Sequence, residues 1–301
     1  MTAPARTIAA ATVARRRRGE RCTCRRSTAT AYHDAETAAH DARRLRLRPV
    51  RALIDRRATG HHSYGIGRCP VIRGPHRAVL FDLFDTLVRL DSGKYLEGKR
   101  EAARVLGVRP ERFIEAWMAA SDQAQTGVLS DIAARIRHAA RACGAEPDED
   151  VIGRVVRMEE EHMTSGSSLY PDVVPTLAAL RARRGLKVGL VSNASSTAAL
   201  LFERLGLDGY FGEPVFSFRV GVLKPHPGIY LKACEVLRVH PAECLFVGDG
   251  NGFELDGAGA LGMETVRVVR PVTPGPFRKG ESLTFDASVD DLTRVLTLVR
   301  I

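Results

Sequence analysis

The chain has 301 residues and a formal net charge of +10, with 45% hydrophobic and 27% charged residues, which are the proportions of an ordinary globular protein. No apolar run approaches the roughly 18 residues that a membrane span needs, so an integral membrane protein is excluded. Six cysteines are too few for a disulfide scaffold, and we therefore expect a reducing compartment, the cytoplasm.

The positive charge is concentrated at the N-terminus. Residues 1–77 hold 18 arginines, no lysine and five acidic residues, so they carry +13 while the remaining chain carries −3. This segment lacks sustained apolar periodicity and has too few core residues to offset the entropy of ordering it. We predict a basic, mostly disordered extension over residues 1–77, in which the one helical candidate is Ala35–Ile54.

Three functions compete with simple disorder for this extension. A basic arm would contact nucleic acid or an anionic membrane, whereas an Arg-rich start with no acid before Glu20 is typical of organelle targeting peptides. A metal site would have to use the cysteines and histidines of the segment, Cys22, Cys24, His61, His62 and Cys69. The Cys-x-Cys spacing is not that of a zinc knuckle, which argues against a metal. The mildly acidic remainder of the chain gives nucleic-acid binding by the main domain no electrostatic support.

The first predicted strand lies near 78–83 and begins with the apolar run Ala78–Phe81, which ends abruptly at Asp82. Continuous apolar runs are typical of parallel strands that are covered on both faces. Ligands of open α/β sheets bind outside the carboxyl ends of such strands. We therefore predict an α/β fold with a doubly wound parallel sheet, and Asp82 is its first candidate site residue.

Residues 92–167 have a helical pattern, with apolar residues spaced three and four apart. The helices are expected over Glu97–Leu106, Pro110–Ala124, Leu129–Cys143 and Asp148–His162. Trp117, in the second helix, is the residue type of a packed core more often than of a substrate contact. We predict an α-helical cap over 92–167, inserted between core segments 78–91 and 168–301, that closes over the site and excludes water.

Two later strands end in polar residues in the same way as the first. A run over 186–191 leads into Ser192 and Asn193, and a run over 244–248 leads into Asp249. Because parallel strands of one sheet end at the same edge, we expect these side chains to meet Asp82 there.

The remaining elements complete the sheet. Short strands are expected near 214–217 and 265–268, and a final helix over Asp290–Val299. Lys224 stands just ahead of a helix expected over Pro227–Leu237, with prolines close to the start of that helix. Lys224 therefore lies in the sequence between the second and third strands that end in candidate site residues.

Taken in order, these residues resemble the four motifs of the haloacid dehalogenase superfamily. The motifs are a strand-end Asp nucleophile, a strand-end Ser or Thr, a Lys before a helix, and a strand-end acidic pair. Their counterparts are the runs 82–87 and 191–193, Lys224-Pro225, and 248–250 followed by Glu254. The resemblance extends from residue 78 to about residue 300, and it implies this family's core with an α-helical cap of the C1 type.

The resemblance implies a Mg²⁺-dependent hydrolase that acts on a small phosphorylated molecule through an aspartyl-phosphate. Asp82 would attack, which splits one difficult displacement into two easier steps. Ser192, Asn193 and Lys224 would bind the substrate and neutralise its charge. Lys224 would also hold the pKa of Asp82 low. Thr86 would stabilise the turn after the first strand.

The metal ligands implied by the resemblance are Asp82, the backbone carbonyl of Phe84, Asp249 and a second acid of the last motif. Mg²⁺ suits such a set because it binds one or two carboxylates together with phosphate and water. Glu254 and Asp256 are both candidates for the second acid, and they point to different faces of a helix. The family pattern places this acid three residues before a Gly-Ala pair, which selects Glu254.

One residue departs from the pattern of the family's phosphatases. Where they carry the Asp that serves as general acid and base, a role worth about 10²–10⁴ in rate, this chain has Phe84. Asp85 lies one residue further, on the opposite side of an extended chain, so it is not an obvious substitute. The substrate would then be an acyl phosphate, whose leaving group needs no proton, or a cap residue or the substrate would supply the acid.

Two further hypotheses stay open. The family's dehalogenases also have an aromatic residue at this place and release halide by carboxylate attack on carbon, so a 2-haloacid dehalogenase is the first alternative. Those enzymes use no metal and have a Ser-Asn arrangement in place of Gly248-Asp249-Gly250, which favours the phosphatase. A family member that has lost its general acid and only binds is the second alternative. We expect a small-molecule partner, no membrane, and no nucleic acid at the core, and the oligomeric state is left open.

Overall fold

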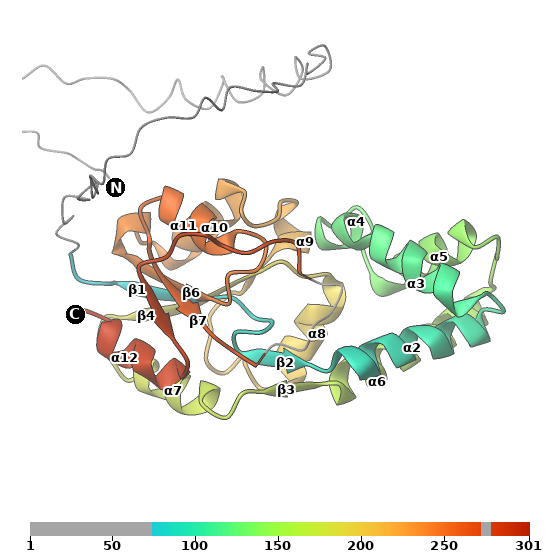
Figure 1. Cartoon of the computed structure of the whole chain (residues 1–301), viewed down its shortest axis with the longest axis horizontal. Helices are drawn as coiled ribbons and strands as arrows, with labels where there is room; N and C mark the ends of the chain where they lie inside the picture. The colour runs from blue at the N-terminus through green and yellow to red at the C-terminus, as the bar shows by residue number, and fades with distance from the viewer. Residues whose placement is uncertain (1–73, 272–277) are drawn as a thin grey trace, which may run out of the picture. The chain divides into compact units, whose positions relative to one another are not determined.

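A computed structural model describes residues 74–271 and 278–301, which lie within one compact unit spanning 68–301 (Figure 1). Its centre is a six-stranded sheet in the order β5-β4-β1-β6-β7-β8, and every pair of neighbours is parallel. The strands are β1 (Ala78–Phe81), β4 (Lys187–Ser192), β5 (Val215–Phe216), β6 (Cys244–Gly248), β7 (Glu264–Val268) and β8 (Ala287–Val289). Strand β1 lies between β4 and β6, so the residue that follows it comes to the middle of the sheet edge.

Helices cover both faces of this sheet. They are α7 (Val173–Arg181), α8 (Ser196–Arg204), α9 (Ser217–Val220), α10 (Pro227–Leu237), α11 (Glu254–Ala260) and α12 (Val295–Leu298), with 3-10 turns at Pro241–Glu243 and Leu292–Arg294. Alternate residues of β1 enter different buried clusters: Val79 and Phe81 join one, and Ala78 and Leu80 join the other. This two-sided burial is the physical reason for the continuous apolar run, and the predicted α/β parallel sheet is confirmed.

A helical segment leaves the core after β1 and returns before α7. It consists of α2 (Ser92–Val105), α3 (Pro110–Ala119), α4 (Ser121–Gln125), α5 (Ile132–Ala142) and α6 (Glu149–Ser165). The antiparallel pair β2 (Val88–Leu90) and β3 (Ser167–Leu169) carries the chain out and back. The side chains of Asp91, Asp131 and Asp148 accept hydrogen bonds from first-turn amides and so begin α2, α5 and α6. The division into core and cap stays a prediction.

The structure corrects several predicted elements. The helix expected over Pro110–Ala124 breaks at Ala120, whose backbone leaves the helical region. The helix expected over Asp290–Val299 is reduced to the turn Leu292–Arg294 and α12, because the Asp291 side chain caps a 3-10 turn first. The strand near 214–217 has two residues, and β2, β3 and β8, of three residues each, are too short to show a periodic pattern.

Two further points concern the boundaries of the description. The predictions for the N-terminal extension, including the helix Ala35–Ile54 and the Cys/His metal site, fall mainly on residues 1–73, outside the described residues. Within the described residues, none of the helices combines the length and apolarity that crossing a membrane requires.

Candidate active site

Asp82 stands immediately after β1, where its amide still pairs with the carbonyl of Val247 in β6 at 3.0 Å. The side chain is buried, with 6% of the residue exposed. One carboxylate oxygen, Oδ1, accepts from Lys224 Nζ, and the other, Oδ2, accepts from Thr86 Oγ1 at 3.3 Å. The sheet register therefore fixes the carboxylate, and two donors orient it.

Asp82, Asp249 and Glu254 form one buried cluster, in which an oxygen from each carboxylate lies within 4.8 Å of the others. Asp249 follows β6, and Glu254 begins α11, so neighbouring strand ends supply the three groups. A Cβ at position 248 would lie 2.2 Å from Glu254 Oε1, so a larger residue there would displace this carboxylate. The Gly250 amide donates to that same oxygen at 3.0 Å and holds the carboxylate in place.

Of the two candidates for the second acid, the structure brings Glu254 into this cluster. Asp256 turns away, and its carboxylate accepts from the amides of Leu283 and Thr284 at 3.0 and 3.1 Å. Asp256 thus anchors the chain before β8 and does not face Asp82.

Lys224 lies between two of the clustered carboxylates. Its Nζ donates to Asp82 and, at 2.5 Å, to Glu254 Oε2. Burial works to lower the pKa of Lys224, but Asp82 and Glu254 outweigh it, and the pKa is raised above its ordinary value. The lysine therefore stays charged inside the site.

Asn193 holds the backbone of Lys224 and thereby positions its side chain. The Lys224 amide donates to Asn193 Oδ1 at 2.7 Å, and Asn193 Nδ2 donates to the Lys224 carbonyl at 3.1 Å. Both ends of the carboxamide are therefore engaged, although Asn193 also lines the cavity in front of Asp82. If Asn193 also binds the substrate, as predicted, its carboxamide has to contact the substrate in addition to the Lys224 backbone.

Ser192, the last residue of β4, is fully buried. Its Oγ has no hydrogen-bond partner among the described residues. A buried hydroxyl without a partner is costly, and it is a donor that a ligand oxygen or a water molecule would satisfy. Ser192 thus has the free donor that the predicted role in phosphate binding needs.

Burial changes the predicted electrostatics of Asp82. Burial raises the pKa of Asp82, Lys224 opposes the rise, and Asp249 adds to it. The expectation that Lys224 keeps this pKa low is therefore wrong for the protein without a metal, because desolvation outweighs the single lysine. Burial likewise raises the pKa of Glu254 well above its usual range.

The charges around the cluster fit a divalent cation. Asp82, Asp85, Asp249 and Glu254 line the cavity, and the two cations that pair with these carboxylates are Lys224 and Arg278. Four carboxylates against two cations leave a formal charge of −2 in a largely buried site, and carboxylate oxygens are the ligands that Mg²⁺ prefers. The residues present therefore suit the predicted metal.

Comparison with known proteins shows the family of the chain. A family model described as haloacid dehalogenase-like hydrolase matches residues 76–262. The chain belongs to the haloacid dehalogenase-like hydrolases. Glyceraldehyde 3-phosphate phosphatase of Methanopyrus kandleri is 31% identical over 231 residues, which cover 74% of this chain and 97% of the relative.

Dehalogenases are similar to this hydrolase as well. (S)-2-haloacid dehalogenase 1 of Pseudomonas sp. strain CBS-3 is 32% identical over 130 residues, covering 43% of this chain and 56% of the relative. The solved structure of L-2-haloacid dehalogenase from Xanthobacter autotrophicus superposes with a TM-score of 0.53 at 26% identity, covering 74% of this chain and 98% of that one. Family membership alone does not distinguish a phosphatase from a dehalogenase, so the residues of the site have to decide between the two reactions.

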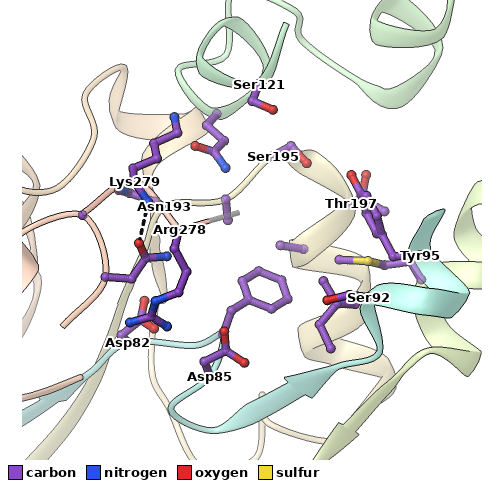
Figure 2. Close-up of a pocket in the computed structure, with 18 of the residues that line it drawn as sticks. Asp82, Asp85, Ser92, Tyr95, Ser121, Asn193, Ser195, Thr197, Arg278 and Lys279 are labelled. Atoms are coloured by element: carbon purple, nitrogen blue, oxygen red, sulfur yellow. Dashed lines mark hydrogen bonds between the residues drawn. The ribbon is translucent and has the colours of Figure 1, made fainter. Parts of the chain in front are cut away.

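Arg278 is a site residue of this hydrolase that sequence reasoning missed. Its Nη1 donates to Asp249 Oδ2 at 2.7 Å, and its guanidinium also pairs with Glu281. Figure 2 shows Arg278 reaching down toward Asp82 and Asp85. The residue lies in the connection between β7 and β8, where no periodic pattern or motif marks it.

Asp85 was also misjudged. The chain after Asp82 is not extended as predicted, because β1 ends at Phe81 and Asp85 adopts a left-handed backbone with φ 55°. The carboxylate of Asp85 consequently lines the same cavity as Asp82 (Figure 2). Burial raises the pKa of Asp85 to about 6, with added repulsion from Asp249 and Asp82.

Arg270 and Asp172 support the turn that carries Thr86. Arg270 donates twice to the Thr86 carbonyl, at 3.2 and 2.9 Å, and twice to the Asp172 carboxylate, at 2.7 and 2.9 Å. Such a bidentate pair is geometrically specific as well as strong. The buried guanidinium of Arg270 therefore fixes the loop between Asp82 and β2, another role that the sequence did not indicate.

Proposed function

We propose that this hydrolase is a Mg²⁺-dependent phosphatase that acts on a small phosphorylated metabolite through an aspartyl-phosphate on Asp82. The observation that carries the proposal is the buried set Asp82, Asp249 and Glu254 with its excess of negative charge. A site for halide displacement alone would have no need to bury two further carboxylates beside the nucleophile, since burying unpaired charge is expensive.

In the proposed reaction, Asp82 attacks the phosphorus, the bond to the leaving oxygen breaks, and that oxygen departs as an alcohol once it takes a proton. Water then attacks the aspartyl-phosphate, which releases phosphate and restores Asp82. Lys224 and Ser192 donate to the phosphoryl oxygens as negative charge spreads over them. Asn193 keeps Lys224 in position, and Thr86 orients the nucleophile.

Asp82, Asp249, Glu254 and the Phe84 carbonyl are the proposed Mg²⁺ ligands, and the ion supplies positive charge that offsets both the carboxylates and the phosphoryl group. The leaving group is a separate matter, because Phe84 cannot donate a proton. Acyl phosphates leave without one. For the hydrolysis of an ester, the proposed proton donor to the leaving group is Asp85, whose carboxylate lines the cavity.

The test compares p-nitrophenyl phosphate with acetyl phosphate, each with Mg²⁺ and with EDTA. We expect Mg²⁺-dependent release of phosphate that falls about 10⁴-fold in Asp82→Asn, because the amide cannot form the intermediate. Asp208→Asn, which changes an exposed aspartate in the same way, is the matched control and should keep full activity. Turnover that is unaffected by Asp82→Asn would overturn the proposal.

A 2-haloacid dehalogenase is the second candidate, and one observation favours it. Phe84 lines the cavity beside Asp82, and the resemblance to the family's dehalogenases implies an aromatic residue at this position. In that reaction Asp82 would displace halide from carbon, and water would then hydrolyse the ester. Chloride release from 2-chloropropionate in EDTA, without any phosphate release from the two phosphates, would select this function instead.

We propose the cytoplasm as the place of action and a small molecule as the partner. Cys143, Cys234 and Cys244 are free, and the Sγ atoms of Cys234 and Cys244, which lie 3.9 Å apart in the core, share a hydrogen bond and form no disulfide. Free thiols at this distance suit a reducing compartment. Mass spectrometry of alkylated protein purified from cytosol should find both thiols reduced.

A further inference from the structure

The cavity in front of Asp82 continues into the helical segment. At its far end it is lined by five residues from α2, α3, α5 and α6, called here the distal cluster: Tyr95, Lys99, Trp117, Arg135 and Glu159. Figure 2 shows Tyr95 across the cavity from Asp82 and Asp85, with Ser121 above them. The same cavity therefore joins the candidate nucleophile to a second group of charged and aromatic side chains.

Two members of the distal cluster neutralise one another. Lys99 Nζ donates to Glu159 Oε2, and both side chains are buried, with 3% and 2% exposed. The same ammonium lies 4.0 Å from the centre of the Tyr95 ring and 4.6 Å from that of Trp117. Buried in this way and stacked on two rings, Lys99 has its charge fully compensated.

Arg135 is compensated less fully, because Glu159 and Tyr95 act on its charge only at longer range. The residue is 7% exposed, yet no carboxylate of the described residues forms an ion pair with it. Its Nη2 donates to the Trp117 carbonyl at 2.8 Å and to Ser121 Oγ at 3.0 Å, and the guanidinium stacks 4.0 Å from the centre of the Trp117 ring. Its Nε has no acceptor among the described residues, and Glu159 Oε1 likewise has no donor.

This arrangement favours an anion. An ionised side chain that is buried without a counter-charge costs several kcal/mol in general, and two neutral hydrogen bonds and one ring offset only part of that. With Glu159 already engaged by Lys99, the distal cluster keeps one positive charge in excess, and its unused N–H groups suit a planar carboxylate. In the proposed function the Asp82 end takes the phosphoryl group, and because one cavity joins the two ends, a single molecule filling it would bring its other end to Arg135.

We propose that Arg135 binds a carboxylate at the end of the substrate remote from the phosphoryl group, so that the substrate is a phosphorylated carboxylic acid. This inference rests on the proposed phosphatase function. It assigns the recognition of the substrate to α5, while Lys99 and Trp117 position the guanidinium by neutralising Glu159 and by stacking.

The test uses two substrates with the same three-carbon phosphorylated skeleton, 3-phosphoglycerate and glycerol 3-phosphate, of which only the first ends in a carboxylate. We expect kcat/KM of the wild type to favour 3-phosphoglycerate by about ten-fold or more, the scale of one charge-assisted contact. Arg135→Met should abolish this preference, mainly through KM. Arg135→Lys should retain part of the preference.

Arg141→Met is the matched control, because Arg141 lies on the same helix, is exposed and pairs with Glu146 at the surface. It should leave the preference unchanged. Equal kcat/KM for the two substrates in the wild type overturns the inference whether or not the Arg135 variants fold. An equal loss with both substrates in a folded Arg135→Met protein also overturns it, since a core residue would act in this way.

A binding measurement separates this inference from the proposed function. If no phosphate is released from any substrate, acetyl phosphate included, the phosphatase proposal fails. Calorimetric titration of the full chain in Mg²⁺ then decides the role of Arg135 by itself. Tighter binding of 3-phosphoglycerate than of glycerol 3-phosphate, lost in Arg135→Met, supports the carboxylate site, and equal binding of the two ligands rejects it.

Discussion

The two ends of the cavity hold buried charges of opposite sign and are built from different elements. At the Asp82 end, four carboxylates face Lys224 and Arg278 on loops that follow strands. At the Arg135 end, two cations face Glu159 on packed helices. The register of the sheet fixes the first end, whereas only side-chain packing between helices fixes the second. Under the proposed function, chemistry and selectivity would therefore reside in separable parts, so substitutions at the Asp82 end should change turnover and those at the Arg135 end should change the choice of substrate.

The largest effect is expected for Lys224→Met at the Asp82 end. The variant removes the cation that contacts both Asp82 and Glu254, so the transition state loses a buried positive charge. We expect kcat for acetyl phosphate to fall about 10³-fold, as for the loss of one preorganised electrostatic contact. Steady-state kinetics with saturating substrate measures this change.

Lys232→Met is the control, because Lys232 lies on α10 beyond Lys224 and pairs with Glu235 at the surface. Its turnover should equal that of the wild type. A Lys224→Met protein whose kcat stays within a few-fold of the wild-type value would contradict this prediction, since catalysis at the Asp82 end would then not depend on its buried cation.

A middle-sized effect is expected from the metal. The Asp82 end carries an excess of negative charge and the Arg135 end does not, so Mg²⁺ should stabilise the fold only through the carboxylate cluster. At a hundred times its Kd, Mg²⁺ should raise the free energy of unfolding by about 2.7 kcal/mol. Urea unfolding with Mg²⁺ and with EDTA measures the difference. It should disappear in Asp249→Asn and persist in Arg135→Met, and a shift that Asp249→Asn leaves intact would place the ion elsewhere.

The two ends also differ in how well the sequence predicts them. Asp82, Ser192 and Asp249 follow continuous apolar runs, and because parallel strands must end at one edge, the pattern itself predicts that these residues meet. The fold class follows from the same runs, since each strand is buried on both faces. What failed here was local: the turn at Asp85 is not extended, and no pattern in the β7–β8 connection indicates Arg278.

The Arg135 end could not be predicted in this way. Lys99 and Glu159 lie 60 residues apart on amphipathic helices, where charged residues are normally solvated. The spacing of apolar residues predicts the helices but not which neighbour each face meets, because that depends on the packing of α2, α3, α5 and α6. Trp117 shows the limit: it is a core residue, as its type suggests, and it lines the cavity as well.

The smallest effect expected concerns stability at the Asp82 end in the absence of metal. Burial raises the pKa of Asp85 from its ordinary 3.8 to about 6. The folded protein therefore binds more protons than the unfolded chain between these values, and this carboxylate costs stability as the pH rises through that window. Asp85→Asn removes the cost. At pH 7 in EDTA it should stabilise the protein by about 1 kcal/mol, a value discounted because the side chain is only half-buried.

The pH dependence separates this electrostatic gain from a simple change of packing. Urea unfolding of wild type and Asp85→Asn should show the full gain at pH 7, and the gain should shrink as the pH is lowered from 6 toward 4, where the wild-type carboxyl is protonated as well. Saturating Mg²⁺ should also reduce it, because the cation then offsets the charge that the variant removes. A variant that is less stable than the wild type at pH 7, or a gain that is the same at pH 4, would mean that the excess negative charge is not what distinguishes this end of the cavity from the other.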